Sequence, residues 1–212
     1  FRREPTARDG LFLASKTHER TKDGALGLLA DSLARIGTNR LDLWQMHDLR
    51  SRDDLRTMFG AGGAIEAAEQ AKKEGRVRFV GLTGHADPDI LLEAIRSYAF
   101  DAVLLPINPA DPARKPFVST VIPAARERGM GVIGMKVMAH GMLVADGRAT
   151  AEECIRYAMA HADTLIIGCS TPDEVRQNLR IARTATAMGD DEQRALEARV
   201  ASQAAKYTYF KA

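Results

Sequence analysis

Short apolar runs alternate along the chain with longer segments in which apolar residues recur every three or four positions. The apolar runs are largely continuous, which is typical of strands covered on both faces of a sheet. They predict strands at residues 11–15, 41–46, 77–82, 102–106, 131–135 and 164–167. The amphipathic segments predict helices at residues 23–36, 63–74, 87–97, 116–128, 150–160 and 172–186, with a last helix over 190–206.

Local signals mark the ends of several of these helices. Asp87-Pro88 and Thr171-Pro172 each place a proline at the first helical position, where its missing N–H group is not needed. Gly75 and Gly129 follow two helix ends, where a residue in the left-handed conformation is favoured. Residues 1–10 are polar, and we expect a loop or part of a helix there.

Six strand–helix pairs in alternation predict an α/β protein with a parallel sheet. Two architectures fit this order, a (β/α) barrel and an open doubly wound sheet. A closed barrel needs eight pairs and is typically about 250 residues long, so the barrel requires two further units before residue 1. The open sheet usually begins with a glycine-rich loop after its first strand. Here Lys-Thr-His-Glu-Arg stands at that position, which favours an incomplete barrel forming one domain over residues 1–212.

Composition excludes several classes of protein. The chain has 212 residues, of which 45% are hydrophobic and 27% charged, as expected for a globular domain with a sizeable core. A net charge of +2 without basic runs argues against a nucleic-acid partner, and no apolar stretch approaches the length of a membrane span. The N-terminus has no signal-peptide core, and the two cysteines, Cys154 and Cys169, favour a reducing, cytoplasmic location.

Titratable residues follow two neighbouring predicted strands. Lys16 comes after Leu-Phe-Leu-Ala-Ser, and His47 comes after Leu-Asp-Leu-Trp-Gln-Met. Because the strands of a βαβ unit are parallel, both residues belong to the carboxyl edge of the sheet, where α/β folds carry their chemistry. Either residue alone is more often structural, the lysine in an ion pair and the histidine in a core hydrogen bond. Their recurrence at one edge points to an enzyme.

Four other stretches could serve a ligand or the fold. Gly81-Leu-Thr-Gly-His85 could open backbone groups to a ligand or form a turn before the next helix. Asn108 lies in a proline-rich segment, where it could hold the loop or touch a ligand. Lys136 ends a strand before a glycine-containing loop and could bind an anion or form a salt bridge. Residues 167–178 run from a strand into a helix whose first N–H groups form an anion site or a plain capped start.

The chain resembles the aldo-keto reductases along nearly its whole length. The resemblance rests on LFLASK (11–16), SLARIGTNRLDLWQMHD (32–48), EGRVRFVGLTGH (74–85), AVLLPINP (102–109), GVIGMKVMAHGML (131–143) and IIGCSTPDEVRQN (166–178). It implies an eight-fold (β/α) TIM barrel, in which residues 11–15 match the third strand and only about six units lie within this chain. It also implies reduction of a small-molecule aldehyde or ketone with NADP or NAD as cofactor.

The resemblance assigns catalytic roles to Lys16 and His47. In the family a tyrosine donates the proton to the carbonyl oxygen, a lysine held by an aspartate lowers the pKa of that tyrosine, and a histidine orients the carbonyl. That aspartate and tyrosine belong to segments preceding Phe1. Tyr98, Tyr157, Tyr207 and Tyr209 fall on predicted helices or the C-terminal tail, so we expect none of them to replace the donor.

Cofactor contacts are implied for eleven residues: Thr83, Gly84, His85, Asn108, Met135, Lys136, Gly168, Cys169, Ser170, Gln177 and Asn178. The chain also departs from the family pattern. Leu104 replaces a glutamine that holds the carboxamide, and Met135 replaces a tyrosine that stacks on the nicotinamide ring. Lys136 replaces a serine near the pyrophosphate, and Glu174 stands where members preferring the 2′-phosphate often carry Arg or Gln. A carboxylate there would repel that phosphate.

Two hypotheses follow. In the first, the chain is the C-terminal three-quarters of a carbonyl reductase, and residues before Phe1 supply the aspartate and tyrosine. In the second, it is a non-catalytic barrel fragment that binds a nucleotide or a partner. We expect this chain alone to be nearly inactive and to bind NAD(P)H weakly to moderately. Because an open barrel exposes two sheet edges, we also expect marginal stability or self-association.

Overall fold

The computed structural model describes residue 8 and residues 10–211. The loop or helix expected over residues 1–10 therefore lies almost entirely outside the described residues. The described residues divide into two compact units. Unit 1 comprises the residues up to Gly84 together with Asp89–Val103, and unit 2 comprises His85–Pro88 together with the residues from Leu104 onwards.

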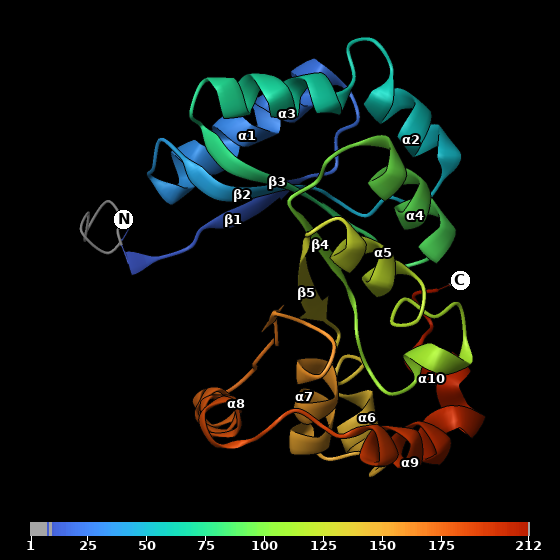
Figure 1. Cartoon of the computed structure of the whole chain (residues 1–212). Coiled ribbons are helices and arrows are strands. Elements are labelled where there is room, and N and C mark those ends of the chain that lie inside the picture. The colour runs from blue at the N-terminus through green and yellow to red at the C-terminus, as the bar shows by residue number, and fades with distance from the viewer. Residues whose placement is uncertain (1–7, 9, 212) are drawn as a thin grey trace. The chain divides into compact units, whose positions relative to one another are not determined.

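Six strands of the described chain belong to one sheet, in the order β1-β2-β3-β4-β5-β6, and helices separate them in sequence (Figure 1). The strand pairs β1–β2, β2–β3 and β5–β6 are all parallel. The strands are β1 Ala14–Thr17, β2 Leu41–Met46, β3 Val77–Thr83, β4 Ala102–Pro106, β5 Gly131–Met135 and β6 Thr164–Leu165. The predicted α/β class with a parallel sheet is confirmed.

Unit 1 contains the helices α1 Lys22–Ile36, α2 Arg52–Phe59 and α3 Ala64–Lys73, and all but the first residue of α4 Pro88–Ser97. Thr21 begins α1 by accepting a hydrogen bond from the N–H of Gly24, and Gly37 ends it in the left-handed conformation with φ 77°. Figure 1 shows α1 and α3 on the same face of β1, β2 and β3. Trp44 and Val80 are paired in the sheet and completely buried.

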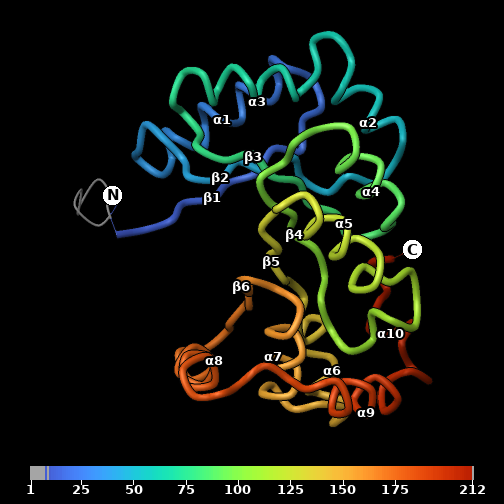
Figure 2. Tube along the Cα trace, in the orientation of Figure 1, coloured from blue at the N-terminus to red at the C-terminus, as the bar shows by residue number. Residues whose placement is uncertain are grey.

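Unit 2 contains the helices α5 Val121–Glu127, α6 Met142–Ala145, α7 Ala151–Met159, α8 Pro172–Thr184, α9 Asp190–Val200 and α10 Ala204–Tyr207, and the 3₁₀ turns η2 Asp111–Ala113 and η3 Ala201–Gln203. Thr150 and Thr171 begin α7 and α8 with reciprocal side-chain and backbone hydrogen bonds to the glutamates three residues later. Figure 2 follows the chain from β6 into α8 and on to α9 and α10.

Three of the predicted elements have clearly different bounds in the structure. The first strand begins at Ala14 rather than at residue 11, because Leu11 and Phe12 are 50% and 61% exposed and pair with no described strand. β1 is therefore only partly buried, contrary to the expectation of a strand covered on both faces. The helix predicted over 116–128 begins at Val121, and β6 ends at Leu165 instead of residue 167.

Three further differences concern helices. The pattern missed α2, although Ser51 and Asp54 form a capping box at its start, and it missed the single turn α6. The helix predicted over 190–206 is interrupted by η3, which separates α9 from α10. The predicted helix starts at Pro88 and Pro172 are confirmed, as are Gly75 and Gly129 with φ 69° and 68°.

Candidate functional site

Lys16 and His47 lie on adjacent parallel strands of unit 1. Lys16 is the third residue of β1 and pairs with Gln45, and His47 follows the last residue of β2. The backbone N–H of His47 donates to the carbonyl oxygen of Thr17 over 2.8 Å, which continues the ladder by one residue. Side chains alternate along a strand, so Lys16, Gln45 and His47 share the face opposite Ser15. The hydroxyl of Ser15 contacts the hydroxyl of Ser32 on α1, so this is the sheet face turned away from α1.

Burial lowers the pKa values of both residues, and neighbouring charges act on that of His47 as well. Partial burial lowers the pKa of Lys16, although much of its side chain is still exposed. Burial lowers the pKa of His47 most, followed by the positive charge of Lys16, and Asp48 opposes both. Arg20 and His18 lower it further. The imidazole of His47 is therefore held in its neutral form near pH 7, with a cationic side chain beside it.

Arg20 fixes the backbone that carries His47, and the sequence pattern gave no sign of this. One guanidinium nitrogen donates to the carbonyl oxygens of His47 and Asp48 over 2.8 and 3.1 Å. Another donates to the carboxylate of Asp54 on α2 over 3.0 Å. Asp48 has φ 54°, a strained conformation for a residue with a side chain. Arg20 lies more than twenty-five residues from these partners, so no local spacing could have revealed the contact.

Thr83 supports the same backbone turn, and the next residue, Gly84, lies against α4. The hydroxyl of Thr83 accepts a hydrogen bond from the N–H of Asp48 over 2.8 Å, and its carbonyl oxygen accepts one from Leu49 over 2.9 Å. A Cβ at Gly84 would stand 2.7 Å from the side chain of Leu91, so this glycine allows α4 to pack closely. His85 is half-buried and belongs to unit 2.

Unit 2 contains a cavity of about 570 Å³ between the loop after β5 and the segment after β6. Its walls include Met135, Lys136, His140 and Gly168, with Cys169 and Ser170 at the start of α8. Of the sequence-predicted cofactor residues, it thus brings together Met135 and Lys136 with the Gly168–Ser170 segment. A cavity of this size falls within the range of small-molecule and cofactor sites.

The loop after β5 has an unusual backbone. Lys136, Ala139 and His140 have φ values of 53°, 49° and 58°, and Gly141 follows with 85°. The amide of Asn108 donates to the carbonyl oxygen of Lys136 over 3.3 Å and accepts from the N–H of Ala110 over 3.0 Å. Asn108 is completely buried, and its two hydrogen bonds join the loop after β4 to the loop after β5.

A carboxylate occupies the start of α8. Glu174 accepts hydrogen bonds from the N–H groups of Ser170 and Thr171 over 2.5 and 3.4 Å, as part of the capping box. The amide of Asn178 donates to the sulfur of Cys169 over 3.2 Å, whereas Gln177 lies exposed on α8. Glu174 lines the cavity, so its negative charge stands on that wall.

Each of the four tyrosine hydroxyls contacts another side chain. Tyr157 and Tyr207 donate to Glu197 and Asp146, each over 2.8 Å. Tyr98 donates to Glu69, and the hydroxyl of Tyr209 shares a hydrogen bond with Nδ1 of His140. Within the described residues no group of histidine, cysteine and acidic side chains could hold a metal ion. No helix in the described part of the chain has the length and apolarity that a membrane crossing requires.

Comparison with known proteins agrees with this fold and these motifs. The sequence profile of the Aldo/keto reductase family matches residues 1–152, more than half of the chain. The chain belongs to the aldo/keto reductase family. Its structure is similar to that of aldo-keto reductase AKR11C1 from Bacillus halodurans in the holo form, with a TM-score of 0.77 and 20% identity. That likeness covers 93% of this chain and 76% of the other, and it confirms the predicted aldo/keto reductase fold.

Two curated relatives each match this chain over only part of the relative's length. D-threo-aldose 1-dehydrogenase from a Pseudomonas species is 29% identical over 124 residues, which cover 58% of this chain and 36% of the relative. The uncharacterized oxidoreductase YqkF of Bacillus subtilis strain 168 is 26% identical over 148 residues, covering 64% of this chain and 45% of the relative. The matches thus span less than half of either relative.

Proposed function

We propose that this chain is part of an oxidoreductase that reduces an aldehyde or ketone with NAD(P)H. Membership of the aldo/keto reductase family and relatives named as a dehydrogenase and an oxidoreductase support a general oxidoreductase role. The observation that carries the proposal is the placement of Lys16 and His47. They lie on adjacent parallel strands, on one sheet face, close enough for the charge of Lys16 to lower the pKa of His47.

His47 is suited to orient a carbonyl group. A neutral imidazole has one N–H group that donates a hydrogen bond to a carbonyl oxygen. Arg20 and Thr83 hold the backbone around His47, so the ring reaches its position without further ordering of the loop. The ammonium of Lys16 places positive charge where negative charge develops on the oxygen as hydride arrives.

The cavity of unit 2 fits a dinucleotide cofactor. Its size and the ammonium of Lys136 suit a pyrophosphate with its attached rings, and Met135 offers a polarizable thioether to a ring. When bound, the nicotinamide supplies hydride to the carbonyl carbon. The carboxylate of Glu174 would repel a 2′-phosphate, which favours NAD(H) over NADP(H) in this cavity.

Carbonyl reduction also needs a proton donor. Each tyrosine hydroxyl of this chain contacts another side chain, and burial raises the pKa of Tyr98 and of Tyr157. Loss of a general acid commonly slows a reaction about 10²- to 10⁴-fold, so we propose that these 212 residues alone are nearly inactive. Aldehyde reduction by this chain at a rate ordinary for reductases would contradict that part of the proposal.

Two variants test cofactor binding by titration of NADH and NADPH fluorescence. K136M removes the cation from the cavity wall, whereas K73M removes an exposed lysine at the end of α3. We expect about tenfold weaker NADH binding for K136M and no change for K73M, because only Lys136 faces the cavity. Absence of binding by the wild-type chain at high micromolar NADH would contradict this cofactor site and would favour the second hypothesis, a non-catalytic barrel fragment that binds a partner or another nucleotide.

The proposal also covers where the protein is located and whether it associates with itself. Cys154 and Cys169 are both free thiols, which is consistent with a reducing cytoplasm. β1 is the first strand in the sheet order of the described chain. A strand at the edge of a sheet presents backbone N–H and C=O groups that can pair with a strand of a second chain. We therefore propose self-association through sheet edges, and sedimentation as a single monomer would contradict it.

A further inference from the structure

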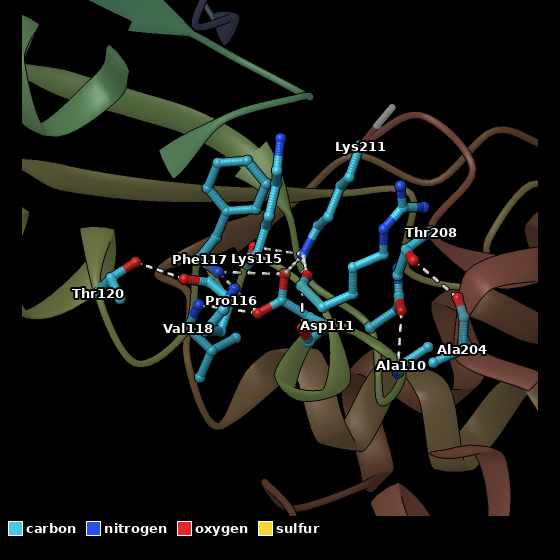
Figure 3. A network of polar contacts seen from close by, with 12 residues as sticks. Ala110, Asp111, Lys115, Pro116, Phe117, Val118, Thr120, Ala204, Thr208 and Lys211 are labelled. Carbon is cyan, nitrogen blue, oxygen red and sulfur yellow. Dashed lines mark hydrogen bonds and ion pairs between the residues drawn. The ribbon is translucent and has the colours of Figure 1, made fainter. Parts of the chain in front are cut away.

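Three consecutive residues near the end of the described chain hold different parts of unit 2. The hydroxyl of Tyr209 shares a hydrogen bond with Nδ1 of His140 over 2.8 Å. The ring of Phe210 lies against the ammonium of Lys136, with the nitrogen 4.0 Å from the ring centroid. The ammonium of Lys211 reaches the segment around η2 (Figure 3). Two of these contacts fall on the loop after β5 and one on the segment after β4.

Lys211 anchors this end of the chain firmly. Its ammonium donates to the carboxylate of Asp111 and to the carbonyl oxygens of Arg114 and Lys115 over 2.9 and 2.8 Å. Both charged side chains have 0% exposure. The carboxylate of Asp111 also accepts from the N–H groups of Phe117 and Val118, each at 2.9 Å, as Figure 3 shows. A buried pair with these additional partners resists displacement, because any shift would leave charges without partners.

The loop after β5, which Phe210 and Tyr209 contact, needs such support. Lys136, Ala139 and His140 all adopt positive φ values. Non-glycine residues in this region are strained and persist only where neighbouring contacts determine them. The contacts of Phe210 and Tyr209 fall on Lys136 and His140, which are the first and last of the three.

We propose that Tyr209–Lys211 form a strap that positions the cation of the cofactor cavity, with Phe210 as the positioning residue for Lys136. Lys211 fixes the strap to the segment after β4, and Phe210 and Tyr209 hold the two ends of the strained loop. Lys136 then stands ready on the cavity wall before an anion arrives, so little ordering accompanies binding. This inference rests on the proposed dinucleotide site, and its test includes a measurement that needs no ligand.

Two substitutions distinguish the effect of the aromatic face of Phe210 from the effect of its volume. F210L keeps an apolar side chain at this nearly buried position but removes the aromatic face, whereas F210Y keeps the face. We expect NADH binding about fivefold weaker in F210L and unchanged in F210Y, with equal melting temperatures. In the K136M background F210L should have no further effect, because the cation it positions is gone. A merely structural role would make F210L weaken binding equally in both backgrounds.

Amide hydrogen exchange of the full 212-residue chain tests the strap without cofactor. The N–H groups of Ala139 and Gly141 donate to carbonyl oxygens within the loop, and the N–H of Asp163 donates to Val132 elsewhere in unit 2. We expect F210L to speed exchange at the two loop amides at least fivefold and to leave Asp163 unchanged. Y209F, which removes only the hydroxyl bound to His140, should speed Gly141 even if F210L does not fold.

The outcomes separate the two proposals. A wild-type chain that binds no NADH contradicts the proposed function, and amide hydrogen exchange alone then tests the strap. Unchanged loop exchange in both F210L and Y209F would overturn the strap. Equal losses of NADH binding in F210L and F210Y would overturn the role of the aromatic ring.

Discussion

The guanidinium of Arg20 donates a hydrogen bond to the carbonyl oxygen of His47 over 2.8 Å. The same nitrogen reaches the carbonyl oxygen of Asp48 over 3.1 Å, and the group is anchored by Asp54. These contacts join the loop after β1 to the loop after β2 and to α2. They also bring a fixed positive charge near the imidazole, which is one of the causes that lower its pKa.

Replacing Arg20 by methionine should raise the pKa of His47. The variant removes a positive charge that disfavours the imidazolium, whereas R20K keeps the charge and loses the paired hydrogen bonds. We therefore expect the His47 pKa to rise in R20M and to stay close to the wild-type value in R20K. NMR titration of the histidine ring protons measures both, and an unchanged pKa in R20M would contradict the electrostatic role of Arg20.

Stability should depend on pH through His47 and His161. Burial is the largest cause lowering both pKa values from the unfolded value of 6.5. The unfolded chain therefore binds more protons than the folded chain between the folded pKa values and pH 6.5. The unfolding free energy should fall as pH drops through that window and should level off above it. H47Q should reduce the slope in urea titrations, and an unaltered slope would mean that His47 is not buried as described.

Gly81 marks a close approach between strands of unit 1. A Cβ there would stand 2.9 Å from the carbonyl oxygen of Ala102 and 3.2 Å from the side chains of Gln45 and Leu43. We expect G81A to lower the unfolding free energy by about 1–3 kcal/mol, because the backbone oxygen must move. G27A is the matched control, since nothing lies within 4 Å of that position in α1. There alanine should stabilise the helix by about 0.5–1 kcal/mol.

The pattern of apolar runs predicted the parallel sheet because each strand is specified by its own residues. β2 and β4 coincide with the predicted ranges 41–46 and 102–106. The predicted start of β1 is too early because Leu11 and Phe12 are apolar yet exposed. Ser51 and Asp54 form a readable capping box, so a search for such pairs would have found α2.

The site was predictable only where local sequence determines it. Lys16 and His47 could be placed at one sheet edge because parallel pairing follows from the βαβ order. Arg20 and Phe210 could not be found in this way, because their contacts join residues 27 and 74 positions apart, a separation no local pattern carries. The prediction that Asn108 either holds a loop or touches a ligand is answered in part, since its amide joins two loops.

The buried pair of Asp111 and Lys211 should be costly to break. D111N leaves a buried ammonium without its carboxylate, so we expect a loss of about 3–5 kcal/mol in unfolding free energy. D111N/K211M should lose less than the sum of the two single variants, because the pair is removed together. D173N on the exposed pair with Arg176 should show no measurable loss. Additive losses in the double variant would contradict direct coupling.

The central claim is that the loops after β5 and β6 hold a nicotinamide dinucleotide in a chain that also presents Lys16 and His47. Amide chemical-shift mapping during NADH titration tests it most directly, because it reports where the ligand binds. The account predicts the largest shifts at residues 135–141 and 168–170, and about tenfold more NADH needed to reach them in K136M. Shifts confined to other regions, or none at saturating NADH, would contradict it.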